Sequence, residues 1–313
     1  MIIIGHRGCG YKGFNQNTIR CYKKVVEQGS KAFEFDVQIT KDNKLVVVHN
    51  LDLTKVSNGE GLVSSKTLKE VKSLYAGNIE NGKDPIPTLE DVLILVSSYE
   101  KKDRPVMHLE LKGDNTGYLS GQIIKEYLDK SLLDINDFLI SSFNWAELEI
   151  IRNVCPNIKI ALLDGSIRRK LLAPRIKTSD HVFSNIFAYG EEDYMIPKST
   201  DFNVSKNLII ENVKDENDRK VLFDEVKRAL DGAYYTDELI NTAIEKNAYS
   251  INLWYETATK EFIEKAHNRG LKVFLYTVNK EKDLDRLKDL NPDGIFTDYY
   301  LDTKNYLEKN RLQ

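Results

Sequence analysis

Cysteine is scarce in this chain, and its few copies lie far apart. Cys9, Cys21 and Cys155 form no Cys-x-x-Cys pair. Disulfide-rich secreted folds and cysteine-ligated zinc sites both need closely spaced cysteines, so the sequence argues against both. The segment Met1–Ile4 is too short for the apolar core of a signal peptide and no basic residue precedes it, so we expect a cytoplasmic protein in a reducing compartment.

The chain also has no long apolar run and no basic stripe. A membrane-spanning helix needs about 18 or more consecutive apolar residues, and because no such run occurs we expect no membrane span. Its 45 Lys and Arg residues are interleaved with 48 Asp and Glu residues, for a formal net charge of -3, so we expect no nucleic-acid partner. A hydrophobic content of 41% over 313 residues is enough for a large core, in one domain or two.

What the chain does have is a regular alternation of strand-like and helix-like segments. Such an alternation predicts a parallel sheet, and eight strand–helix units are the number that closes into a (β/α)8 TIM barrel. We therefore predict an α/β fold in which residues 1–313 form a single domain. The eight predicted strands lie at residues 2–5, 32–37, 106–111, 138–141, 158–163, 250–254, 272–276 and 294–297.

Two segments interrupt this alternation. Residues 51–87 are irregular, with several glycines and prolines, and we interpret them as a small insertion after the hairpin of the second strand. The interval 165–248 is too long for one crossover helix, so we place a longer insertion at about 180–237, with helical pieces near 215–230 and 236–247.

Local signals also mark where helices begin. Asn17 is a plausible N-cap for a helix that ends near Gln28, before Gly29. Thr88 and Asp91 have the spacing of a capping box at the start of another helix.

The second predicted strand carries two carboxylates on one face. Side chains alternate across a strand, so Glu34 and Asp36 leave it together and repel each other. The polar segment Lys41–Lys44 separates two β-branched runs and predicts a tight hairpin turn, in a register that sets His49 opposite Asp36. An imidazole facing two carboxylates favours a cation site, although a solvated edge hairpin explains the same alternation.

The first three predicted strands deliver polar residues to one mouth of the barrel. Residues at the carboxyl ends of barrel strands line the active face of this fold. Glu34, Asp36 and Glu110 offer three oxygen ligands there, without a cysteine or a histidine pair at ligand spacing. Such ligands suit one divalent cation, Mg²⁺ or Ca²⁺, better than zinc.

The same mouth collects two imidazoles and two permanent cations. His6 and His49 arrive from two sides and can divide proton transfer between a base and an acid near pH 7. Arg7 and Lys112 add positive charge. A site of this kind suits a small anionic substrate cleaved by acid–base chemistry, and a phosphodiester fits that description.

These residues belong to a set of ordered motifs that resembles the glycerophosphodiester phosphodiesterase (GDPD) family. The motifs keep the family's order from residue 5 to residue 298, and the ordered set is far more specific than any one of them. They are His6-Arg7-Gly8, Asn17-Thr18, Glu34-x-Asp36, Thr40-x-Asp42, Val46-x-Val48-His49, Ile86-Pro87-Thr88-Leu89-Glu90-Asp91-Val92, Glu110-x-Lys112, Tyr276-Thr277-Val278-Asn279 and Asp293-Gly294-Ile295-x-Thr297-Asp298.

The resemblance implies a barrel of the phosphatidylinositol-phospholipase-C-like phosphodiesterase type. It further implies metal-dependent hydrolysis of glycerophosphodiesters to glycerol 3-phosphate and an alcohol, in which a glycerol hydroxyl of the substrate attacks and gives a cyclic phosphate that water then opens. By the same resemblance, the functional residues map onto the catalytic pair His6 and His49, the metal carboxylates Glu34, Asp36 and Glu110, and the phosphate-facing Arg7 and Lys112.

The chain departs from the family's usual pattern at three of these motifs. Gln16 stands where the family usually has Glu, Asn50 where it has Asp, and Tyr276 where it often has Trp. An amide in place of a carboxylate beside each histidine changes the basicity or the orientation of that histidine, and with it the pH optimum.

Two further residues have open roles. His108 shares a face with Glu110 but lies deeper in the strand, which favours a packed barrel-interior histidine over a catalytic one. Trp254 ends the sixth strand and either binds the substrate headgroup or completes the core.

Two other functions stay open. A lysophospholipase D or a sphingomyelinase-D-like enzyme would share the leaving group but carry an acyl chain on the substrate, and an apolar groove beside residues 51–87 would favour it. A non-catalytic phosphoester-binding barrel is the second alternative. The 180–237 insertion is compatible with a cap over the mouth or with a homo-oligomer.

Overall fold

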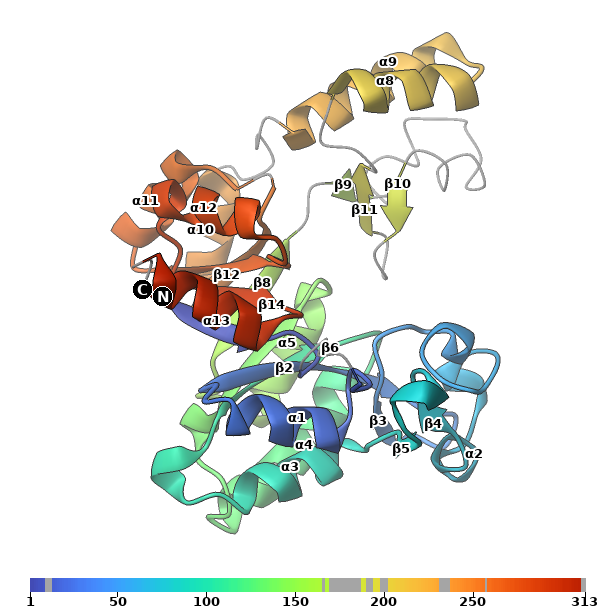
Figure 1. Cartoon of the computed structure of the whole chain (residues 1–313), viewed down its shortest axis with the longest axis vertical. Coiled ribbons are helices and arrows are strands. Elements are labelled where there is room, and N and C mark those ends of the chain that lie inside the picture. The colour runs from blue at the N-terminus through green and yellow to red at the C-terminus, as the bar shows by residue number, and fades with distance from the viewer. Residues whose placement is uncertain are drawn as a thin grey trace.

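Eight parallel strands close into a barrel. The structure is a computed structural model, and it describes residues 1–8, 13–164, 167–168, 187–189, 194–197, 202–230, 237–256 and 258–310. The strand order is β1-β14-β13-β12-β8-β7-β6-β2, and β1 also pairs with β2, which closes the ring (Figure 1). The predicted TIM barrel is therefore confirmed. Its strands are β1 (Ile2–Gly5), β2 (Ala32–Ile39), β6 (Val106–Leu111), β7 (Phe138–Ser142), β8 (Ile160–Asp164), β12 (Ser250–Trp254), β13 (Lys272–Tyr276) and β14 (Gly294–Thr297).

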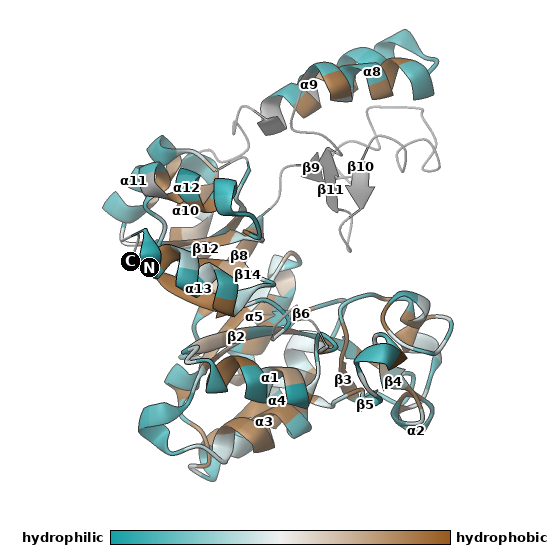
Figure 2. Ribbon diagram, viewed as in Figure 1, coloured by the Kyte–Doolittle hydropathy of each residue, from teal (hydrophilic) through white to brown (hydrophobic). Residues whose placement is uncertain are grey.

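A helix packs on the barrel after each strand. The helices bury one apolar stripe against the outward side chains of the strands, as Phe262, Ile263 and Ala266 of α11 do. Figure 2 shows the barrel strands mainly in brown, while the surrounding helices alternate between brown and teal. The helices are α1 (Ile19–Glu27), α3 (Leu89–Ser97), α4 (Thr116–Asp129), α5 (Trp145–Val154), α10 (Asp237–Glu245), α11 (Lys260–Asn268), α12 (Glu281–Leu290) and α13 (Tyr300–Lys309), with short 3-10 turns at Lys101–Asp103 and Ile135–Asp137.

Side chains fill the interior of the barrel below the carboxyl ends of its strands. Ile4, Phe274 and Phe296 belong to a buried cluster contributed by several strands. His108 lies between the two phenylalanine rings, with ring centroids 5.7 and 5.4 Å away. Burial lowers the pKa of His108 to about 3. His108 is therefore a neutral, packed histidine of the barrel interior, which is the role that the sequence favoured. The open end of the barrel lies at the carboxyl ends of the strands.

The hairpin after β2 has a different register from the predicted one. Strand β3 (Leu45–Val47) pairs antiparallel with β2, and Val37 lies opposite Val47. Continued along the strand, this register sets Asp36 opposite Val48, so the predicted pairing of Asp36 with His49 is wrong by one residue. The cause is a three-residue loop at positions 41–43. Asn43 takes the left-handed conformation with φ of 56°, and the Thr40 N–H donates to the Lys44 carbonyl across 2.9 Å.

Residues 51–87 form a compact insertion with its own small core. Leu53, Val63 and Val71 are buried there together with Val46 and Val48 from the hairpin arm, so the insertion covers the part of the hairpin that extends beyond the barrel. Its elements are short because each packs only against this small core: η1 (Leu53–Lys55), η2 (Val63–Ser65), α2 (Leu68–Lys72), β4 (Tyr75–Ala76), η3 (Ile79–Asn81) and β5 (Asp84–Pro85).

The long insertion follows β8. A small sheet of β9 (Ile167–Arg168), β10 (Phe187–Tyr189) and β11 (Tyr194–Pro197) precedes helices α8 (Phe202–Asn212) and α9 (Glu216–Leu230), which lie side by side away from the barrel helices (Figure 1). The predicted helical pieces near 215–230 and 236–247 are confirmed as α9 and α10, but α8 was not predicted. Residues 180–186, 190–193, 198–201 and 231–236 of the predicted 180–237 insertion lie outside the described residues, as does Cys9. No helix in the described ranges is long and apolar enough to cross a membrane.

Candidate functional site

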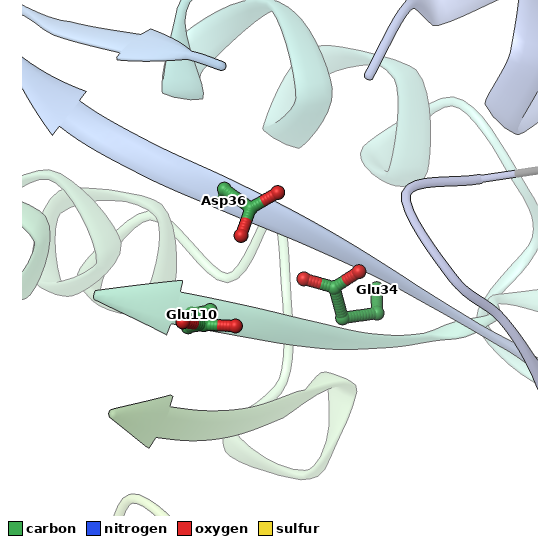
Figure 3. A group of neighbouring side chains, drawn as sticks. All are labelled: Glu34, Asp36 and Glu110. Carbon is green, nitrogen blue, oxygen red and sulfur yellow. The ribbon is translucent and has the colours of Figure 1, made fainter. Parts of the chain in front are cut away.

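Three carboxylates meet at the open end of the barrel. Glu34 and Asp36 leave the same face of β2, and Glu110 of β6 lies directly opposite Asp36 in the sheet (Figure 3). One carboxylate oxygen of each residue lies within 4.8 Å of the others. Glu34 and Asp36 are buried and Glu110 is half-buried, so little water screens their mutual repulsion.

The two buried carboxylates respond in opposite directions to their surroundings. Burial, together with the charges of Asp36 and Glu110, raises the pKa of Glu34 well above its usual range. Burial also acts to raise the pKa of Asp36, but His49, Lys112 and Arg7 outweigh it and lower that pKa below its usual range. Asp36 is therefore the more stable anion of the two. The charged form of Glu34 is destabilised by burial and by the two neighbouring carboxylates.

The donor set fits a hard divalent cation. Glu34 Oε1 and Asp36 Oδ1 are buried acceptors to which no described residue donates a hydrogen bond. A buried, unsatisfied carboxylate oxygen is costly, and a bound cation would satisfy both oxygens while offsetting the repulsion. All three ligands are carboxylates, which Mg²⁺ and Ca²⁺ prefer. The residues predicted as metal ligands are therefore brought together, with one ligand oxygen of each within 4.8 Å of the others.

Two cations flank the carboxylates. Lys112 is buried, with its Nζ 2.6 Å from Glu110 Oε1 and 3.5 Å from Asp36 Oδ1. Arg7 takes a left-handed conformation with φ of 53°, and its backbone N–H donates to Glu34 Oε2 across 2.7 Å, while its Nε lies 3.8 Å from Asp36 Oδ2. The structure thus places both predicted phosphate-binding cations beside the carboxylates, where their charge reaches the same small space.

His6 is held in orientation by a residue from the far end of the chain. Its Nδ1 lies 2.7 Å from Oδ1 of Asp298, which directly follows β14. Asn279 donates to Asp298 Oδ2 across 2.6 Å and accepts the Asp298 backbone N–H across 2.9 Å. The other ring nitrogen of His6, Nε2, is 3.9 Å from Glu34 Oε2 and therefore faces the carboxylates.

Asp298 and Asn279 were not predicted as site residues. Both lie in motifs of the resemblance, and both follow a barrel strand at its carboxyl end, which is the signal that identifies residues of the mouth. The contact itself joins residues 292 positions apart and depends on the pairing of β1 with β14. The sequence pattern alone does not report that pairing.

His49 lies two residues beyond the end of β3, so it reaches the site from the turn after the strand and not as a residue paired with β2. The side-chain amide of Gln38 donates to the carbonyls of Val48 and His49, across 3.1 and 2.8 Å, and fixes this turn. The His49 Nδ1 lies 3.2 Å from Asn50 Oδ1. Burial lowers the pKa of His49 to about 3, although the charge of Asp36 acts in the opposite direction. His49 is therefore a neutral imidazole near Asp36 and able to accept a proton.

Asn17 has a different role from the predicted one. The N-cap of α1 is Thr18, whose side chain accepts the backbone N–H of Cys21. Asn17 instead has a φ of 56° and donates from Nδ2 to Asp36 Oδ2 across 2.9 Å. The prediction of Asn17 as the cap is wrong because its left-handed backbone turns the side chain into the site. There the side chain holds one oxygen of Asp36, which leaves the other oxygen to face the carboxylate cluster.

The opposite wall of the mouth is aromatic. Trp254 ends β12 next to Tyr276 of β13 and is only 9% exposed. The Tyr276 hydroxyl donates to the Asp164 carbonyl across 2.8 Å, and the Phe143 ring meets the Tyr276 ring edge-on at 6.2 Å. These contacts make a rigid wall. They leave both expected roles of Trp254, substrate contact and core packing, compatible with its position.

Comparison with known proteins places these residues in a family context. The sequence model of the Glycerophosphoryl diester phosphodiesterase family matches residues 6–190 and 196–301. A protein named glycerophosphodiester phosphodiesterase from Caldanaerobacter subterraneus subsp. tengcongensis is 28% identical over 304 residues, which cover 95% of this chain and 93% of that relative.

Solved structures show the same fold. A putative glycerophosphoryl diester phosphodiesterase from Silicibacter pomeroyi DSS-3 superposes with a TM-score of 0.70 at 20% identity. The match covers 99% of this chain and 94% of that structure's chain. A phosphodiesterase from Oleispira antarctica, solved in complex with the product sn-glycerol-3-phosphate, gives a TM-score of 0.67 at 19% identity, with coverage of 98% and 97%.

Proposed function

Because the chain belongs to the glycerophosphoryl diester phosphodiesterase family, we propose that it hydrolyses glycerophosphodiesters to glycerol 3-phosphate and an alcohol. One observation carries the proposal. The carboxylates Glu34, Asp36 and Glu110, the imidazoles His6 and His49, and the cations Arg7 and Lys112 converge on one mouth of the barrel. The product in the Oleispira antarctica structure supports glycerol 3-phosphate as the product here.

The carboxylates are the proposed ligands of one divalent cation, Mg²⁺ or Ca²⁺. When bound there, the cation would supply positive charge that neutralises the phosphate and stabilises the charge that develops on its oxygens. Asn17 and Lys112 hold Asp36 and Glu110 in orientation for this role. Arg7 presents a guanidinium at the edge of the same space, where it suits a phosphate oxygen.

The two histidines divide the proton transfers. His49 lies beside the neutral amide of Asn50 and accepts the proton of the attacking hydroxyl, which in this proposal belongs to the glycerol moiety. His6 donates a proton from Nε2 to the departing alcohol oxygen, since the carboxylate of Asp298 on Nδ1 stabilises the protonated ring. The resulting cyclic phosphate is opened by water when the two histidines exchange roles.

A cavity beside His6 favours this substrate class over an acylated one. It has a volume of about 440 Å³, and four amide residues line it together with His6, Arg7, Asp298, Gly77 and the aromatic residues Phe14 and Tyr299: Asn15, Gln16, Asn78 and Asn81. An acyl chain needs an apolar groove, whereas amides bind hydroxyl groups. The cavity therefore supports a deacylated glycerophosphodiester and gives no support to the lysophospholipase D alternative.

The test is release of glycerol 3-phosphate from glycerophosphocholine and glycerophosphoglycerol by the purified protein. We expect release that stops with EDTA and returns with Mg²⁺ or Ca²⁺. His6→Ala and His49→Ala should each lower kcat by about 10²–10⁴-fold, the usual contribution of general acid–base catalysis.

A matched control is His267→Ala. This histidine pairs with Asp293 at the other end of the barrel, so its loss should leave turnover unchanged. If a folded sample releases no product with either metal, or if both histidine variants keep full activity, the proposal is wrong and a non-catalytic barrel becomes the better interpretation.

A further inference from the structure

A cavity next to His6 adjoins the proposed catalytic site. His6, Arg7 and Asp298 line it, whereas Glu34, Asp36, Glu110, His49 and Lys112 do not. Under the proposed function, on which this inference rests, a substrate phosphate lies between the carboxylates and His6. Because His6 protonates the departing oxygen, the part of the substrate that enters this cavity is the leaving alcohol.

Hydrogen bonds within the protein fix the part of the cavity wall around Asn15. Asn15 is buried, and its Nδ2 donates to the Gly82 carbonyl across 2.9 Å and to Asp84 Oδ2 across 3.0 Å. Its Oδ1 accepts the Asn78 backbone N–H across 2.9 Å. Gly77 has a φ of +63°, and a Cβ there would lie 2.3 Å from Asn15 Oδ1, so the two segments meet as closely as a glycine permits. The 51–87 insertion is therefore held against Asn15.

The charges around the cavity do not suit a cationic headgroup. Among the described residues that line it, Arg7 is a permanent cation and Asp298 a carboxylate whose two oxygens already contact His6 and Asn279. The ring of Phe14 already carries the guanidinium of Arg20 at 4.6 Å from its centroid. A quaternary ammonium group binds aromatic faces and anions. Here it would meet Tyr299, the second aromatic residue that lines the cavity, and an Asp298 carboxylate that already contacts His6 and Asn279, beside the guanidinium of Arg7.

Gln16 gives Arg7 a neutral partner on this side of the cavity. Its Oε1 accepts from Arg7 Nη1 across 3.1 Å, so the partner of the guanidinium at this position is neutral. A carboxylate in the same place would form a charge-assisted pair with Arg7 and cancel its charge. The amide instead leaves the positive charge in the cavity and keeps its own N–H groups as donors.

We infer that this cavity binds the leaving alcohol as a small uncharged polyol such as glycerol, and that Gln16 is the residue that selects against cationic headgroups. Asn78 and Asn81 also line the cavity. Asn78 Oδ1 accepts the Glu80 N–H and Asn81 Nδ2 donates to Asn15 Oδ1, and the second N–H and the second lone pair of each amide match the hydroxyl groups of a polyol. Discrimination arises because an ammonium group would lie beside the guanidinium of Arg7 and cannot accept hydrogen bonds from the amide donors of the cavity.

The experiment compares kcat/KM for glycerophosphoglycerol and glycerophosphocholine in the metal-loaded enzyme. We expect the wild type to prefer the glycerol ester by about tenfold or more, and Gln16→Glu to shift the ratio toward the choline ester by about tenfold. The shift should shrink at high salt because it comes from charge. Gln122→Glu, on the exposed surface of α4, makes the same chemical change away from the cavity and should leave the ratio unchanged.

The outcomes separate the inference from the function on which it rests. Turnover of both esters with no preference, or with a preference for the choline ester, would overturn the inference alone. A Gln16→Glu variant that slows both esters equally would also overturn it, because that result indicates a structural role. No turnover of either ester would overturn the proposed function and this inference together.

Discussion

At the scale of single residues, the site is a set of pairs in which one member acts and the other holds it. Asp298 holds His6, Gln38 holds the turn at His49, and Asn17 holds Asp36. Such partners matter because a catalytic group must already point at its target when the substrate binds. Asp298 lies 292 residues from His6, whereas Gln38 and Asn17 lie 11 and 19 residues from their partners, and each pair is a separate test of the site.

Asp298→Asn tests the first of these pairs. The substitution keeps the shape of the side chain but removes the charge that stabilises a protonated His6, so we expect kcat to fall by about 10–100-fold while KM and thermal stability change little. Steady-state kinetics and a melting curve measure the two effects.

The control for this pair is Asp302→Asn, which changes an exposed aspartate on α13 and should have no kinetic effect. A loss of stability in Asp298→Asn without a fall in kcat would contradict the positioning role.

At the scale of elements, the end of the barrel opposite the site depends on one aspartate. Asp293 precedes β14, and its Oδ2 accepts from the Val273 N–H and lies near His267 Nε2, both at 2.8 Å. Its Oδ1 accepts from Lys272 across 2.8 Å. These contacts join α11, β13 and β14. Burial acts to raise the pKa of Asp293, but the Lys272, Val273 and His267 contacts outweigh it and lower that pKa from the ordinary 3.8.

Asp293→Asn should therefore destabilise the barrel without affecting catalysis. We expect a loss of about 1–2 kcal/mol at pH 7, measured by urea denaturation, since charge-assisted hydrogen bonds are lost. The pKa is lower in the folded chain than in the unfolded one, so the stabilisation is complete above the unfolded value and disappears as the pH falls through the folded value. The difference between wild type and variant should shrink below about pH 4.

A surface substitution provides the comparison for this element. Asp289→Asn on α12 removes an exposed carboxylate and should leave both the free energy of unfolding and its pH dependence unchanged within about 0.5 kcal/mol. If Asp293→Asn and the wild type differ by the same amount at pH 3 and pH 7, the assigned role of the charge is wrong.

At the scale of the whole molecule, the carboxylate cluster links metal binding to stability. A cation that binds only the folded chain stabilises it by RT ln(1 + [L]/Kd), or about 2.7 kcal/mol at one hundred times Kd. For a chain of this size we expect Mg²⁺ or Ca²⁺ at that concentration to raise the melting temperature by about 4 °C, and EDTA to reverse the rise.

Glu34→Gln should abolish that rise while leaving the metal-free protein at least as stable as the wild type. The reason is that Glu34 is destabilised by burial and by its two carboxylate neighbours, so its neutral replacement relieves repulsion. Glu126→Gln, an exposed residue of α4, should keep the full metal-induced shift. Loss of stability in metal-free Glu34→Gln, or a metal shift equal to that of wild type, would contradict this view of the cluster.

Much of this molecule followed from the sequence by itself. The eight strands were predicted within two residues at each end, because alternating strands and helices have distinct periodicities that each segment carries locally. Glu34 and Asp36 had to share a face, since a strand turns alternate side chains the same way. The histidines, carboxylates and cations were identified because they end strands or lie in family motifs.

Only the tertiary structure decided how these parts meet. The loop of three residues at Asn43 shifted the hairpin by one position, and the left-handed backbone of Asn17 turned a predicted cap into a partner of Asp36. Closure of β1 against β14 brought Asp298 to His6, and the 51–87 insertion supplied the wall of the cavity. Periodicity records which face of its own element a residue occupies, whereas contacts between distant segments depend on barrel closure and on the packing of side chains around it.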